Sequence, residues 1–128
     1  MTIFGWVGLV VAAACGGMAR VVVDGEIRAW RSARGGDGAG PLGIAVVNVV
    51  GSLLLGVLIG AGATGDVFGI LGTGFLGGFT TFSTAAVDIV EFALAGRGLT
   101  ALKWGGGVLA AAFAAALCGL WLGMQFVA

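Results

Sequence analysis

The chain has no histidine, little charge and few cysteines, and each scarcity excludes a class of protein. Only 9% of its 128 residues are charged, with six basic residues against six acidic ones. No run of Lys or Arg exists, so the basic surface typical of nucleic-acid binding is missing. Cys15 and Cys118 stand in apolar stretches without the spacing of a metal or redox motif, and we interpret both as small hydrophobic residues. We therefore expect no nucleic-acid partner.

Apolar residues and glycine are abundant instead, at 59% of the chain and 27 positions. A stretch of about 20 apolar residues crosses a bilayer, and such stretches occur at about residues 3–23, 42–63, 67–94 and 99–127. Glycine lets membrane helices approach one another closely. We therefore expect an all-α membrane protein, with one domain of four transmembrane helices over residues 1–128. Residues 24–40 form the expected loop, in which residues 26–34 can make a short interfacial helix.

The basic residues are divided unevenly between the two sides of such a bundle. If the chain crosses four times, the loops after the first and third spans share one side. All six basic residues lie on that side or at its border: Arg20, Arg28, Arg31, Arg34, Arg97 and Lys103. The positive-inside rule then predicts that the loops at 24–40 and 95–98 are cytoplasmic and that both termini are outside.

The second span carries polar and small residues on one face. Asn48 is a full amide in an apolar segment, so it needs a partner. Ser52, Gly56, Gly60 and Thr64 follow at four-residue spacing, which by itself is more typical of helix packing than of a pore. For Asn48, two interpretations stay open: a hydrogen bond between helices, or a pore lining whose amide donates to a passing anion.

The third span is longer than one crossing requires, and its centre is rich in glycine and hydroxyl residues. These are Gly72, Gly74, Gly77, Gly78, Thr80, Thr81, Ser83 and Thr84. A break in the helix at membrane depth survives only where protein or a watery cavity covers it, so the pattern indicates a site. The alternative is a flexible, closely packed helix. The G-x-G-x-x-G spacing inside this run follows no strand, and we reject a nucleotide site.

Three charged residues border the spans. Arg20 ends the first span, as an anchor that reaches the interface or as part of a vestibule that attracts anions. We expect Asp88 and Glu91, near the end of the third span, to be interfacial and solvated, and we assign them no proton relay.

Together these residues resemble the fluoride channel family called Fluc or CrcB, over the whole chain. The resemblance rests on Gly16-Gly17 with Arg20, on the stretch from Gly43 through Asn48 to Gly51, and on the run from Gly72 to Thr84 with Asp88. It implies an antiparallel dimer of the dual-topology type in a bacterial inner membrane. Two narrow pores would pass fluoride out of the cell passively and without catalysis.

The resemblance also implies roles for individual residues. A structural sodium ion, which is not transported, would be held at the dimer centre by the main-chain carbonyls of Gly77 and Thr80. The pore would use Asn48 and Phe82. Beyond the resemblance, the hydroxyls of Thr81, Ser83 and Thr84 are our candidate pore donors, and Arg20 is our candidate for an anion vestibule. Close donors and the positive edge of a Phe ring suit fluoride, which is small and strongly hydrated.

The sequence departs from the family pattern at three places. Ala85 stands where the family has a second pore Phe, Ile44 stands in place of a Thr, and the last span has no Ser or Thr after Thr100. A chain that inserts both ways also needs balanced Lys and Arg, which this chain lacks. Our hypothesis is a heterodimer in which a partner of opposite orientation supplies part of the pore; a homodimer is the alternative.

Two other functions remain in view. A subunit without a working pore could serve only the assembly of its partner, and the missing pore residues favour this rival. A small drug–proton antiporter also has four helices, but it needs a carboxylate deep in the bundle, and the first span has none.

Overall fold

The computed structural model describes residues 1–36 and 40–127, and within these ranges the chain is helical without strands. Four helical stretches are long and apolar enough to cross a membrane: Ile3–Ala33, Leu42–Gly60, Gly65–Leu94 and Gly98–Met124. Large apolar side chains face outward along them, and Phe4 and Leu94 are each 84% exposed. Since water would penalise such a surface and lipid does not, the expected all-α membrane fold is confirmed.

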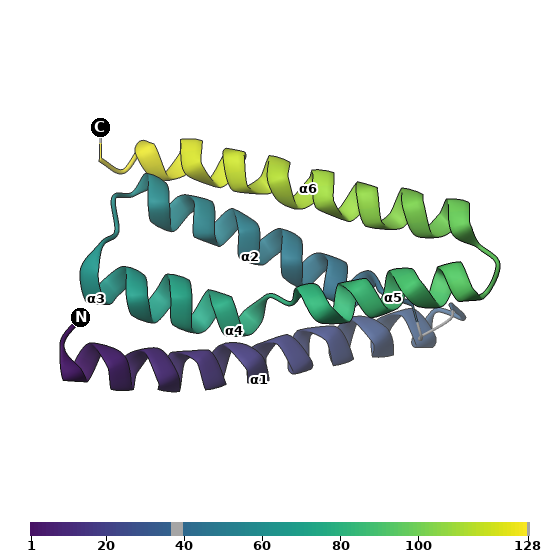
Figure 1. Ribbon diagram of the computed structural model, residues 1–128, viewed down its shortest axis with the longest axis horizontal. Helices are drawn as coiled ribbons and strands as arrows, with labels where there is room; N and C mark the ends of the chain where they lie inside the picture. The colour runs from purple at the N-terminus through teal and green to yellow at the C-terminus, as the bar shows by residue number, and fades with distance from the viewer. Residues whose placement is uncertain (37–39, 128) are drawn as a thin grey trace.

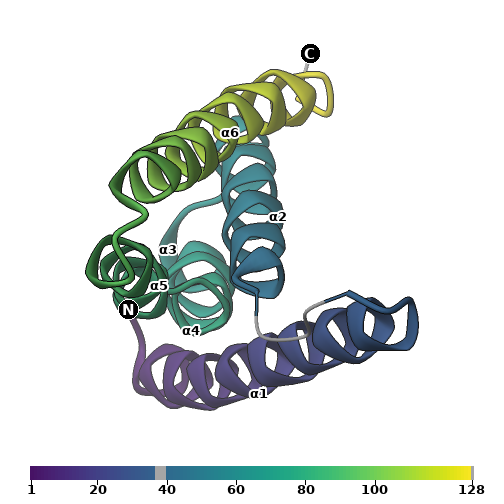
Figure 2. The same cartoon turned by 90° about the vertical axis from the view of Figure 1, so that its right-hand side faces the viewer.

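The four stretches lie side by side as an up-and-down bundle (Figure 1). Both chain ends lie at one end of the bundle, and the connections from α1 to α2 and from α5 to α6 lie at the other. Viewed along the bundle, α1 and α6 occupy opposite edges, with α2 on one side between them and the α3–α5 segment on the other (Figure 2).

The first helix, α1 (Ile3–Ala33), is longer than expected. It does not end near Val23, and it absorbs most of the expected loop; residues 37–39 of that loop lie outside the described residues. Residues 24–33 are rich in good helix formers. Arg28 Nε also contacts Asp24 Oδ2 at 2.8 Å, one helical turn away. The local sequence therefore continues the helix beyond its apolar part.

Glycine joins α2 (Leu42–Gly60) to α6 (Gly98–Met124) at one end of the bundle. Gly56 lies against the backbone of Ala116, and Gly119 lies against the carbonyl of Leu53. A side chain at either position would overlap main-chain atoms, so only glycine permits this contact. Near the start of α6 the two helices separate, as Figure 2 shows.

The third stretch is not one regular helix. It consists of α3 (Gly65–Phe68), the π-helix η1 (Gly69–Leu76), the short α4 (Gly77–Phe79) and, after a break at Thr80 and Thr81, α5 (Phe82–Leu94). The expected break is present. π-Helical turns are rare and frequently accompany functional sites.

Contacts at two places fix this stretch against the first helix. At its beginning, Thr2 Oγ1 donates to Asp66 Oδ2 at 2.6 Å. At η1 and α4, Gly16 lies against the carbonyl of Phe75, and Gly78 lies against the backbone of Ala13. The half of the third stretch that precedes the break is therefore held tightly to the first helix.

Candidate functional site

The break exposes main-chain groups in the middle of a membrane-spanning segment. Thr80 (φ −78°, ψ 160°) and Thr81 (φ −151°, ψ 126°) are extended. Thr80 N donates to Leu76 O at 2.9 Å, as in a helix. In a continuous helix Thr81 N would donate to Gly77 O, but here it donates to Asn48 Oδ1. The break therefore frees the carbonyl of Gly77 from its helical donor.

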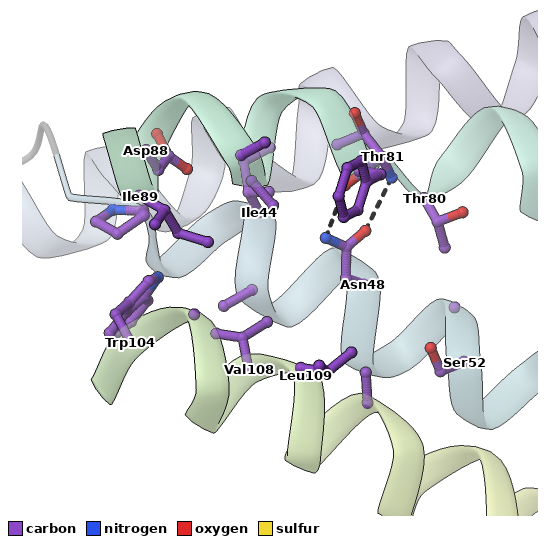
Figure 3. A pocket seen from close by; sticks show the side chains of 18 of the residues that line it. Ile44, Asn48, Ser52, Thr80, Thr81, Asp88, Ile89, Trp104, Val108 and Leu109 are labelled. Carbon is purple, nitrogen blue, oxygen red and sulfur yellow. Dashed lines mark hydrogen bonds between the residues drawn. The ribbon is translucent and has the colours of Figure 1, made fainter. Parts of the chain in front are cut away.

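Asn48 of α2 holds the break by both ends of its amide. Its Nδ2 donates to Thr81 O at 2.9 Å, and its Oδ1 accepts from Thr81 N at 2.8 Å (Figure 3). Asn48 therefore does form the bond between helical segments that was one of its two interpretations. A side-chain amide carries a second N–H, so this pairing leaves Asn48 a donor.

A cluster of hydroxyls begins α5. Thr81, 9% exposed, caps this helix through Oγ1, which accepts from Thr84 N at 3.4 Å. The same Oγ1 lies 3.3 Å from Ser83 Oγ and 3.2 Å from Thr84 Oγ1. Ser83 is exposed and Thr84 half-buried. The three predicted hydroxyl residues therefore do lie together.

A cavity of about 640 Å³, here called the break cavity, opens beside the break between α2, α5 and α6. It is lined mainly by apolar groups, with Asn48, Thr80 and Thr81 among its few polar side chains. Phe82 also lines it and is 89% exposed. Ser83, Thr84 and Arg20 are not among the described residues that line the break cavity. The structure therefore brings together only part of the predicted pore and vestibule residues.

Two of the three departures from the family pattern also lie at this cavity. Ile44 and Ala85 are both in its wall. Ile44 precedes Asn48 by about one turn of α2, and Ala85 follows Phe82 by about one turn of α5. The wall therefore lacks the hydroxyl and the aromatic ring that the family pattern would place at these two positions.

Arg20 lies at the depth of the break and not at the end of its span. Because α1 continues to Ala33, Arg20 is inside the helix, and its Nη1 donates to Thr80 O at 3.4 Å. Gly17, one turn earlier, lies near Gly78 O, so α1 is close enough for the guanidinium to reach the end of α4. The first helix therefore does not end at Arg20, as the apolar pattern predicted.

Asp88 also differs from expectation. Its Oδ2 is buried and finds no hydrogen-bond partner among the described residues, and the side chain lines the break cavity (Figure 3). Asp88 is therefore half-buried at the cavity, and only part of its carboxylate is exposed as expected. Trp104, which was not among the predicted residues, also lines the cavity and is followed by three glycines. The three glycines could have indicated this position, because residues without side chains leave space beside α6 for a cavity.

Comparison with known proteins identifies the family. Residues 7–124 match the family described as "CrcB-like protein, Camphor Resistance (CrcB)". A protein of Leifsonia xyli subsp. xyli named fluoride-specific ion channel FluC 1 is 40% identical over 92% of this chain and 85% of its own length. The fluoride-specific ion channel FluC 2 of Cutibacterium acnes is 43% identical over 94% and 96%. The chain therefore belongs to the CrcB family, the family of the fluoride-specific ion channels FluC.

Proposed function

We propose that this chain is a subunit of a fluoride channel that exports fluoride passively and lowers its cytoplasmic concentration. The observation that carries the proposal is the pairing of Asn48 with Thr81, which stabilises a helix break beside an open cavity in a membrane helix. Relatives that align with nearly the whole chain are named as fluoride-specific channels. Membership in a family of channels counts against both an enzyme and a drug–proton antiporter.

The chemistry of the cavity suits a small anion. The free N–H of Asn48 and the hydroxyl of Thr81 are donors in a largely apolar wall. Such donors replace water around a dehydrated ion, and the edge of the Phe82 ring carries a partial positive charge. We assign Ser83 and Thr84 a supporting part, because they contact Thr81 rather than the cavity.

We also propose that a structural sodium ion is held by the carbonyls of Gly77 and Thr80. The donor set fits, because carbonyl oxygens suit a hard cation. Gly77 O has lost its helical donor, and Thr80 O, which accepts from Arg20, keeps a second lone pair. These carbonyls also end α4, where the helix dipole is negative. In this chain Arg20 supplies part of the positive charge that the carbonyls require.

Replacing sodium with N-methyl-D-glucamine throughout purification is therefore expected to lower the dimer fraction and fluoride efflux only a few-fold in the unmodified protein. In the Arg20→Gln variant the same replacement should cost about tenfold or more, because both cations are then absent from the end of α4. Size-exclusion chromatography and efflux from vesicles measure the two effects. Equal dimer fractions and rates in both media, for both variants, would contradict a sodium site here.

We propose that the partner is a second subunit of opposite orientation. The observations favour a different chain over a second copy of this one. The break cavity is open and Phe82 is almost fully exposed, so another subunit is needed to enclose an ion path. Apart from Arg20, the basic residues belong to one end of the bundle, which favours a single orientation with both termini outside.

Expression of this chain alone tests the heterodimer. Vesicles loaded with potassium fluoride and carrying only this chain are expected to release fluoride at least about a hundredfold more slowly than a related homodimeric channel, as for a site that lacks several of its donors. A fluoride electrode measures the release. Rapid efflux from the single chain would rule the heterodimer out while leaving the fluoride channel intact.

A subunit that serves only assembly is the second candidate, and the apolar Ile44 and Ala85 in the cavity wall favour it. The two candidates differ in the effect that a change at Asn48 has on fluoride transport by the assembled channel.

A further inference from the structure

A second groove, here called the outer groove, runs between α2 and α6 on the side that faces away from α5. It has a volume of about 370 Å³ and is lined over two turns of each helix, from Leu42 to Val50 and from Lys103 to Ala111. Its wall is apolar except at Lys103. The groove exists because α2 and α6 touch backbone to backbone at their far ends but separate near Lys103. There, a side chain added at Gly107 would meet no atom of another described helix within 4 Å.

The shape and direction of the outer groove match a lipid acyl chain. It follows the helix axes, and eight residues of helix span about 12 Å. Half the hydrocarbon core of a bilayer is about 15 Å thick, so the groove has the length of a chain in one leaflet.

The positive charge at one end of the outer groove favours a lipid with a negatively charged headgroup. Lys103 is exposed there, and Trp104 beside it is an aromatic residue of the kind that prefers the membrane interface. Arg97 precedes α6 at the same end of the bundle, and α1 ends there with Arg28 and Arg31. A lysine at the mouth of an apolar groove, within a basic end, is complementary to a negatively charged headgroup.

We propose that the outer groove binds one anionic phospholipid, with an acyl chain between α2 and α6 and its headgroup at Lys103. The site has a consequence for the break cavity, because Ala45, Trp104 and Val108 line both hollows. These three residues therefore separate the break cavity from the outer groove, and Figure 3 shows Trp104 and Val108 on the cavity side. An acyl chain in the outer groove would therefore pack against the outer side of the residues that line the break cavity.

Retention of lipid by the purified protein tests the proposal. The protein in mild detergent is mixed with phosphatidylglycerol or with phosphatidylcholine of the same chains, and native mass spectrometry counts the lipid that stays bound. The unmodified chain is expected to keep phosphatidylglycerol in preference. Lys103→Gln should reduce this preference about fivefold, the effect of removing one basic residue from an anionic headgroup. Gly107→Leu should reduce retention of both lipids by filling the groove.

Two matched variants serve as controls. Arg97→Gln removes a charge from the same end of the bundle, and Ala110→Leu adds bulk to an exposed position of α6; neither residue lines the outer groove. Ala110→Leu is expected to keep the lipid as the unmodified chain does, and Arg97→Gln to lower the preference for phosphatidylglycerol much less than Lys103→Gln does. Equal losses in Arg97→Gln and Lys103→Gln, or unchanged retention in Gly107→Leu, would overturn the site. The proposal would also be overturned if the unmodified chain kept no lipid and if Lys103→Gln and Gly107→Leu each abolished its dimer. A second subunit, and not a lipid, would then occupy the groove.

Discussion

Asn48→Asp is expected to slow fluoride efflux from the assembled channel by on the order of a hundredfold, although the two side chains have the same shape. Thr81 N can still donate to one carboxylate oxygen. The other oxygen replaces Nδ2, 2.9 Å from Thr81 O, so two acceptors then face each other across a bond that held the break. A negative charge in the break cavity also opposes the entry of an anion.

Vesicles loaded with potassium fluoride and a fluoride electrode give the rate, and size-exclusion chromatography reports whether the complex assembles. Ser52→Ala is the control, because Ser52 is one turn further along α2 and lines the same cavity. It should change the rate by no more than about twofold, as expected for a weakly placed hydroxyl. If Asn48→Asp assembles and conducts normally, the subunit serves assembly alone.

Gly16→Ala is expected to destabilise the fold by about 3 kcal/mol or more, because overpacking against a backbone cannot be relieved by a rotamer change. The added methyl group would overlap the carbonyl of Phe75, and Phe79 N lies within 2.9 Å of the same point. Relief requires α1 to move away from η1 and α4. That movement would also withdraw Arg20 from Thr80, so efflux should fall together with stability.

The neighbouring glycine supplies a matched comparison. At Gly17 the nearest atom to an added methyl group is Gly78 O, at an ordinary contact distance of 4.0 Å. Gly17→Ala is therefore expected to be neutral or to stabilise the helix by up to about 1 kcal/mol. Thermal unfolding of both variants in the same detergent measures the difference. Similar unfolding temperatures for the two would mean that α1 does not pack on η1 as closely as described.

The bundle and its break could be predicted because both follow from local composition. A bilayer sets the length of an apolar helix, and a dense run of glycine and threonine inside one marks irregular backbone. Asn48 was identified because a lone amide in an apolar span needs a partner. In each case the residue types alone were sufficient for the prediction, and the positions of neighbouring helices did not have to be known.

The depth and direction of the charged residues could not be predicted in this way. The apolar pattern stops near Val23, but helix propensity continues, so the end of the pattern misplaced Arg20. For Asp88 the direction of the side chain depends on everything that precedes it in the third stretch, including a π-helix whose presence no local pattern revealed. Both errors concern where a helix faces or ends, which packing decides.

The π-helix η1 (Gly69–Leu76) has a consequence of its own for how this segment tolerates change in length. Its hydrogen bonds run from i to i+5, so each of its turns holds one residue more than an α-helical turn. Loss of one residue from η1 can therefore be absorbed by a change from π-helix to α-helix, which leaves Thr81 facing Asn48. The same loss from a regular α-helix has no such outlet and would rotate everything beyond it by about 100°.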